Sequence, residues 1–196
     1  METIVFATNN PNKIREVQQL LGSNYQFLSL EEVGCMEELP ETSPTLEGNA
    51  LEKARHLYHH YHHDCFSEDT GLEVEALNGA PGVITARYAG PERDARLNMQ
   101  KLLRELGPHT NRKARFRTVI ALIINGKEYL FEGIVNGSIS HELQGEDGFG
   151  YDPVFIPEGE NRTFAQMSKE EKNAVSHRGR AIAKLQDFLK KQLHHG

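Results

Sequence analysis

The stretch Thr3–Gly22, TIVFATNNPNKIREVQQLLG, indicates the class of fold. Its first part is a short apolar run of the kind found in buried strands. Its second part repeats apolar residues at helical spacing, which places Ile14, Val17, Leu20 and Leu21 on one predicted face. A strand that leads through a polar loop into a helix is half of a β–α unit, so this stretch predicts α/β architecture.

The lysine of this stretch has an unusual position. Asn10 followed by Pro11 predicts a helix start, so Lys13 falls in the first turn, where the helix dipole is already positive. A bound anion would reverse the sign of that interaction, and Thr8, the first-turn N–H groups and Lys13 could together bind a phosphate. The alternative is a lysine on a solvated surface. The sequence contains neither a Walker loop nor a dinucleotide glycine fingerprint.

The rest of the chain predicts a sheet covered by helices. Asn125-Gly126 is a favoured two-residue hairpin turn and separates two apolar strands, so part of the sheet is expected to be antiparallel. Apolar residues at helical spacing predict further helices, the first of which is opened by Pro44. Ser168 with Glu171 forms a capping box at the start of a later helix. The expected fold is α/β, with a mixed, twisted central sheet flanked by helices.

Composition limits the classes of function. The chain has 196 residues, 38% of them apolar and 26% charged, which suits one globular domain or two closely joined lobes sharing a core. The net charge of -6 and the lack of long like-charged blocks disfavour a nucleic-acid polymer or a membrane surface as partner. No signal peptide or membrane span is recognisable, so we expect a soluble, cytoplasmic protein. Cys35 and Cys65 match no zinc or redox spacing and are expected to be reduced.

Adjacent acids in the middle of the chain suggest a metal site. Cys65–Leu77, CFSEDTGLEVEAL, predicts two strands joined by a tight Asp-Thr-Gly turn, with Glu68 and Asp69 at a strand end. Neighbouring carboxylates repel each other, and Mg²⁺ would remove that repulsion. The alternative is turn chemistry alone. Glu41 and Lys53 are further charged candidates, against the alternatives of a loop acid and a surface lysine.

A glycine-rich stretch suggests contact with a base. In Gly145–Phe155, GEDGFGYDPVF, Gly148 and Gly150 flank Phe149, so that the backbone could approach a ligand while the ring stacks on a base. Asp152 precedes a proline and is expected to be extended. The alternative is that Phe149 is a core residue and Asp152 a turn acid.

A basic cluster lies near the C-terminus. Lys172, His177 and Arg178 occur within EEKNAVSHRG, and donors of this kind suit phosphate oxygens or a carbonyl on a base. A solvated basic patch near a helix end is the alternative.

Taken in order, these motifs resemble one enzyme family, the inosine/xanthosine triphosphate pyrophosphatases. The motifs are TNNPNK, Glu41 with GNALEKAR, EDTGLEVEAL, GAPGVITARYAG, GFGYDPVF and EEKNAVSHRG, and they span nearly the whole chain. That family hydrolyses ITP, dITP and XTP to the monophosphate and pyrophosphate. The resemblance implies a single domain, residues 1–196, with two lobes and the active-site cleft between them, Mg²⁺ as cofactor, and a homodimer.

The resemblance also implies roles for the candidate residues. Asp69 resembles the catalytic carboxylate and Mg²⁺ ligand, and Glu41 a second metal-site acid. Glu68 stays open as ligand or neighbour, because the family commonly has Asp-Asp-Ser-Gly here. The residues implied to bind substrate are Thr8, Asn9, Asn10, Pro11, Asn12, Lys13, Lys53, Thr70, Phe149, Gly150, Tyr151, Asp152, Lys172, His177 and Arg178.

A mechanism follows from these parts. Mg²⁺ and the lysines would neutralise the triphosphate while Asp69 orients or deprotonates a water that attacks the α-phosphorus. Donors that meet the 6-oxo group would reject adenine, whose amino group leaves them unpaired. Two rivals are a non-catalytic nucleotide-binding sensor and a homodimeric aspartic protease. The protease shares the Asp-Thr-Gly signature, but its nearly all-β fold conflicts with the helical patterns.

Overall fold

A computed structural model describes residues 2–21, 24–146 and 150–195 of the protein. Its helices are α1 (Pro11–Leu21), α2 (Leu46–Tyr61), α3 (Ala95–Leu106), α4 (Lys169–Val175) and α5 (His177–His195). Its strands are β1 (Glu2–Phe6), β2 (Tyr25–Leu28), β3 (Cys65–Val74), β4 (Lys113–Ile124), β5 (Lys127–Ile139) and β6 (Phe155–Pro157). Short 3₁₀ helices include η1 (Glu31–Val33), η3 (Gly82–Arg87), η4 (Asp152–Val154) and η5 (Phe164–Gln166).

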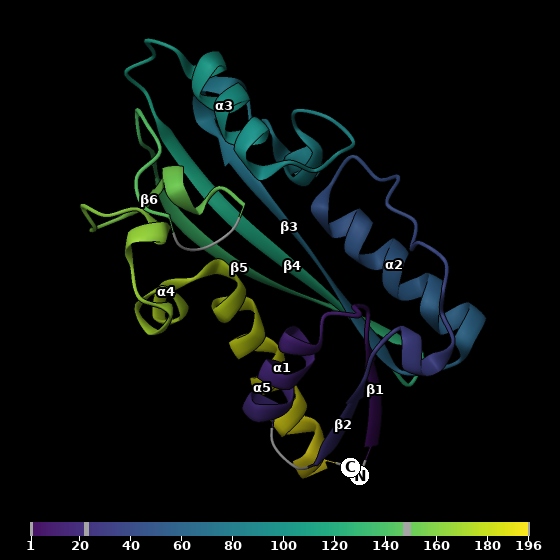
Figure 1. Ribbon diagram of the computed structural model, residues 1–196. Helices are drawn as coiled ribbons and strands as arrows, with labels where there is room; N and C mark the ends of the chain where they lie inside the picture. The colour runs from purple at the N-terminus through teal and green to yellow at the C-terminus, as the bar shows by residue number, and fades with distance from the viewer. Residues whose placement is uncertain (1, 22–23, 147–149, 196) are drawn as a thin grey trace. The chain divides into compact units, whose positions relative to one another are not determined.

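The strands form one mixed sheet. Their order is β2-β1-β3-β4-β5-β6 (Figure 1). β1 is parallel to β2 and to β3, whereas β5 and β6 are antiparallel. Asn125 and Gly126 have φ values of 52° and 78°, as a tight hairpin turn between β4 and β5 requires. The predicted mixed α/β fold is confirmed.

The chain divides into two compact units. The first comprises Met1–Asp69, Val119–Glu132 and Ala181–Gly196, and the second comprises Thr70–Thr118 and Gly133–Arg180. Strands β3, β4 and β5 therefore contribute residues to both units.

The first unit packs helices α1 and α5 on the sheet. Phe6 and Phe66 stack with their ring centroids 4.3 Å apart, and Val17 of α1 and Leu185 of α5 lie in the same buried cluster. Val17 and Leu21 are buried as predicted, but Leu20 is 44% exposed. The buried face of α1 is thus narrower than the apolar pattern suggested.

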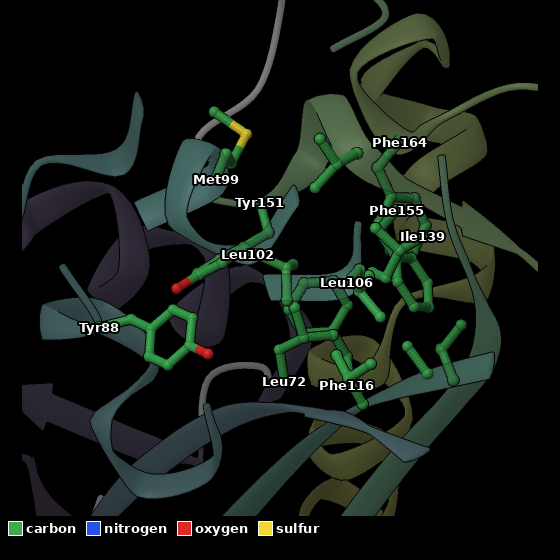
Figure 2. Close-up of a cluster of buried hydrophobic side chains, with 14 of the residues drawn as sticks. Leu72, Tyr88, Met99, Leu102, Leu106, Phe116, Ile139, Tyr151, Phe155 and Phe164 are labelled. Carbon is green, nitrogen blue, oxygen red and sulfur yellow. The ribbon is translucent and has the colours of Figure 1, made fainter. Parts of the chain in front are cut away.

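The second unit has a hydrophobic cluster of its own. Leu72 of β3, Leu102 and Leu106 of α3, and Phe116 of β4 are buried in it (Figure 2). Phe155 stacks on Phe116 edge to face, with centroids 4.6 Å apart. Each unit therefore buries apolar side chains around its own part of the sheet.

Three local predictions were wrong. Asp152 was expected to be extended, but it is the first residue of the 3₁₀ helix η4. Helix α2 begins at Leu46 and not at Pro44, because Thr45 is its N-cap and accepts a hydrogen bond from the N–H of Gly48 at 3.0 Å. No turn interrupts β3, which runs without a break from Cys65 to Val74. The Asp-Thr-Gly stretch stays extended beside β4, its neighbour in the sheet, and the Thr70 hydroxyl lies 2.8 Å from that of Thr118 on β4. Strand β1 pairs with β3 before this stretch, at Cys65 and Phe66.

Among the described residues, each helix is too short or too polar to cross a membrane.

Candidate functional site

The start of α1 is held by side chains of its own loop. The Asn10 Oδ1 atom accepts hydrogen bonds from the N–H groups of Asn12 (3.0 Å) and Lys13 (3.4 Å), and Thr8 Oγ1 accepts one from Asn10 (3.1 Å). Pro11 is the first helical residue, as predicted, and has no N–H. Two of the amides expected to bind phosphate are thus already bonded to Asn10. The ammonium of Lys13 becomes the main donor at this helix end.

Asn9 fixes the same loop to the next segment. Its Oδ1 accepts a hydrogen bond from the N–H of Glu31 in η1 at 2.8 Å, and the N–H of Leu30 donates to the carbonyl of Thr8 at 3.1 Å. Asn9 therefore sets the position of the loop that carries Thr8 and Asn10.

Strand β3 separates its two acids onto opposite faces. Successive side chains of a strand point to opposite sides of the sheet. The side chains of Cys65 and Ser67 donate to the carbonyls of Ala54 and Ala50 in α2, so Asp69 shares the α2 face. Phe66 packs in the cluster that contains α1, so Glu68 shares the α1 face.

Glu68 pairs with the lysine of α1. Lys13 Nζ lies 2.9 Å from Glu68 Oε1. The lysine side chain is 36% exposed and the glutamate side chain only 11%. An anion therefore does lie at the positive end of α1, and in this structure it is a carboxylate of the protein itself.

Lys53 lies beside the two remaining candidate acids, Glu41 and Asp69. Its ammonium lies 2.7 Å from Glu41 Oε1 and 3.9 Å from Asp69 Oδ1, and it donates to the backbone carbonyl of Glu68 at 2.7 Å. The lysine is one helical turn from Asn49 of α2, whose Oδ1 accepts from the N–H of Ser43. Helix α2 and the loop before it thus bring Glu41 and Lys53 to the strand that carries Asp69.

The oxygen donors around Lys53 suit Mg²⁺. This ion is usually held by one or two carboxylates and substrate phosphates, and it keeps several waters. Within the described part of the chain, no three His, Cys, Asp or Glu side chains form a ready-made metal cage. Glu41 and Asp69 therefore fit a magnesium site that the substrate itself would complete.

The second unit contains the other candidates. Lys172 Nζ of α4 lies 2.5 Å from Asp152 Oδ2, and the Asp152 side chain is only 7% exposed. The His177 ring, at the start of α5, stacks on Phe116 with centroids 4.7 Å apart and planes inclined by 16°. Phe164 lies beside both groups, 5.7 Å from the ammonium of Lys172 and 6.5 Å from the His177 ring. Lys172 and His177 thus lie beside one aromatic cluster, and Asp152 pairs with Lys172.

Phe116 and Phe164 are site neighbours that the sequence analysis missed. Phe116 alternates with arginines in the first part of β4, and Phe164 belongs to η5. Their only local signal is apolar character, which is also typical of any core residue.

Thr70 is the first residue of the second unit. Its hydroxyl is 2.8 Å from that of Thr118 on β4, and Thr118 is fully buried. Gly150 has a φ of +63°, a conformation that glycine adopts without strain. Phe149 lies outside the described residues, and Arg178 follows His177 in the first turn of α5.

Tyr151 is a core residue of the second unit. Its side chain points into the buried cluster of Figure 2, the residue is 3% exposed, and its hydroxyl donates to the carbonyl of Thr85 at 2.7 Å. Burial raises the pKa of Tyr151, so the hydroxyl stays protonated as a donor. We infer that the Tyr151 hydroxyl stabilises the packing of this unit and does not contact the substrate.

Replacing Tyr151 with phenylalanine tests this inference. The change removes one buried hydrogen bond, so we expect unfolding free energy to fall by about 1 kcal/mol. The KM for ITP, the substrate that the sequence resemblance implies, should change less than about twofold, since a buried hydroxyl makes no substrate contact. Urea unfolding and steady-state kinetics measure the two effects. A tenfold rise in KM with unchanged stability would show direct contact instead.

A separate groove of about 770 Å³ lies on the second unit. Its wall includes Lys113, Arg115 and Glu73, and the Glu73 carboxylate pairs with Arg115 at 2.6 Å and with Arg117 at 3.0 Å. None of the predicted site residues lines this groove. It is therefore distinct from the candidate site.

Comparison with known proteins places the chain. A model of the Ham1 family matches residues 4–188. The dITP/XTP pyrophosphatase of Flavobacterium psychrophilum is 55% identical over 187 residues, which cover 95% of this chain and 98% of that protein. The dITP/XTP pyrophosphatase of Porphyromonas gingivalis is 53% identical over 191 residues, covering 96% and 98%. The structure of the Staphylococcus aureus Ham1 protein matches with a TM-score of 0.94 at 38% identity, over 97% of this chain and all of that one. The chain belongs to the Ham1 family.

Proposed function

We propose that this protein hydrolyses dITP, ITP and XTP to the nucleoside monophosphate and pyrophosphate. The observation that carries the proposal is the arrangement of charges in the first unit. Lys13 pairs with Glu68, and Lys53 lies beside both Glu41 and Asp69. Full-length similarity to proteins named dITP/XTP pyrophosphatase supports the same substrate class. Because these nucleotides belong to the nucleotide pool, we infer that the protein acts in the cytoplasm.

The first unit would bind the triphosphate. Lys13 and Lys53 supply cationic donors for the phosphate oxygens, and the loop ordered by Thr8, Asn9 and Asn10 holds the helix end that carries Lys13. Glu41 and Asp69 would hold Mg²⁺, which supplies charge neutralisation for the polyphosphate and for departing pyrophosphate.

Asp69 would carry the proton transfer. Its carboxylate orients a water molecule and accepts one proton from it as the water oxygen bonds to the α-phosphorus. The bond between the α-phosphorus and the bridging oxygen breaks, and pyrophosphate leaves with that oxygen. Lys53, 3.9 Å from Asp69 Oδ1, would hold this carboxylate in place beside the attacking water.

The second unit would read the base. The ammonium of Lys172, oriented by Asp152, can donate to the 6-oxo group of hypoxanthine or xanthine, and His177 and Arg178 can add donors. Adenine has an amino group at that position, so the same donors would be left facing another donor. Phe149 is proposed to stack on the base, and Thr70 to lie beside the triphosphate.

Product analysis tests the proposed function. Wild-type protein with ITP and Mg²⁺ should release pyrophosphate and IMP in equal amounts, and ATP should be a substrate at least about 100-fold poorer in kcat/KM. A nucleotide-binding sensor would bind ITP and release nothing. Release of inorganic phosphate and IDP would show cleavage between the β- and γ-phosphates and would contradict the proposed function. The molar mass of the same purified protein, measured by light scattering, tests the proposed homodimer.

A further inference from the structure

Glu68 and Lys13 form a pair whose members differ in freedom to move. The Glu68 carboxylate is nearly buried on β3, whereas Lys13 is more than one-third exposed on α1. A nearly buried carboxylate is costly without a cation beside it. A partly exposed lysine has a flexible stem, so its ammonium can reach a second anion without movement of the helix.

Strand β3 directs the side chains of Glu68 and Asp69 toward different lysines. Asp69 and Glu41 both meet the ammonium of Lys53, on the side of α2. Glu68 joins that group through its backbone carbonyl, and its side chain lies on the side of α1. The side chains of Glu68 and Asp69 are thus directed to different cations, which argues against their holding one metal ion together.

We propose that Glu68 is a positioning residue that holds Lys13 until the polyphosphate of the substrate takes the lysine from it. A polyphosphate carries more negative charge than one carboxylate, so the ammonium exchanges partners when the nucleotide binds. Glu68 therefore competes with the substrate for Lys13 and is not a magnesium ligand. The inference rests on the proposed function, because it needs a polyphosphate at α1.

The exchange predicts a coupling between two substitutions. Glu68→Gln keeps the side-chain length and removes the charge that competes for Lys13. Affinity for ITP, measured by calorimetry in EDTA so that no turnover occurs, should rise about two- to fivefold, the range expected when a partly exposed ion pair no longer has to be broken. In a Lys13→Ala background the gain from Glu68→Gln should be at least about twofold smaller, because only charge repulsion remains.

A metal titration separates Glu68 from the ligands. Mn²⁺ is titrated into protein saturated with an ITP analogue whose α–β bridge is a methylene group that resists hydrolysis, because the phosphates of the substrate complete the site. Glu41→Gln and Asp69→Asn should each weaken Mn²⁺ binding by about tenfold or more, as expected for loss of a metal-ligand contact. Glu68→Gln should change it less than about twofold. Glu128→Gln is the matched control in both experiments, since Glu128 is paired with Arg55 at 2.6 Å in the same unit. Thermal unfolding checks that each variant is folded.

The outcomes are distinct. Equal gains from Glu68→Gln with and without Lys13 would overturn the exchange, and so would failure of the wild-type protein to bind ITP in EDTA. Loss of Mn²⁺ binding in Glu68→Gln to the extent seen in Asp69→Asn would also overturn it, because Glu68 would then be a ligand. If wild-type protein with Mg²⁺ releases no pyrophosphate from ITP, the proposed function itself fails.

Discussion

Replacing Asp69 with asparagine is expected to lower kcat for ITP by about 10³-fold while ITP binding is largely retained. The amide has the shape of the carboxylate but cannot accept a proton from water, and loss of a general base costs about 10²–10⁴ in rate. Lys13 and Lys53, the lysines proposed to bind the triphosphate, stay in place. Binding should therefore change far less than turnover.

Two measurements check this prediction. Pyrophosphate release at saturating ITP and Mg²⁺ gives kcat, and calorimetry in EDTA gives the affinity without turnover. Asp64→Asn is a suitable control, because Asp64 also lies in the first unit, where its carboxylate accepts from the N–H of Asn125 at 3.0 Å. If Asp69→Asn retained a tenth of wild-type turnover, Asp69 could not be the general base.

Replacing Lys172 with methionine is expected to lower kcat/KM for ITP by about 100-fold and to reduce the preference for ITP over ATP. Methionine keeps the length of the stem but cannot donate to the 6-oxo group. The change also leaves Asp152 nearly buried without its cation, which is costly. A lower midpoint of thermal unfolding should therefore accompany the loss of activity.

A second variant separates selectivity from stability. Lys172→Met with Asp152→Asn removes the buried charge as well, so the midpoint should recover in part while the ITP preference stays low. Lys169→Met, at an exposed position of the same helix, should leave both properties unchanged. An ITP-to-ATP ratio of kcat/KM that survives in both Lys172 variants would exclude Lys172 as a reader of the base.

Local signals in the sequence were sufficient for much of the fold. The strand and helix of Thr3–Gly22, the hairpin at Asn125-Gly126 and the capping box of Ser168 each depend on residues close in sequence, and all three are present. The predicted turn at Asp69 was wrong because it also depended only on residues close in sequence. Asp-Thr-Gly has local turn preference, but this part of β3 lies beside β4 in the sheet and stays extended.

The arrangement of the site was harder to predict from the sequence than the fold. The types of candidate residue could be recognised, but Lys13 and Glu68 are 55 positions apart, and their pairing depends on how α1 packs against β3. The sequence did not show that the side chains of Glu68 and Asp69 lie apart. Their adjacent positions suggested a shared site, whereas strand geometry directs consecutive side chains to opposite faces of the sheet. Burial of Tyr151 likewise depends on tertiary packing.

The position of bond cleavage tests the central claim most directly. ITP is hydrolysed by the protein with Mg²⁺ in water enriched in ¹⁸O, and the products are separated and weighed by mass spectrometry. Attack of water on the α-phosphorus predicts one ¹⁸O atom in IMP and none in pyrophosphate. Label in pyrophosphate, with unlabelled IMP, would show attack on the β-phosphorus and would contradict the account.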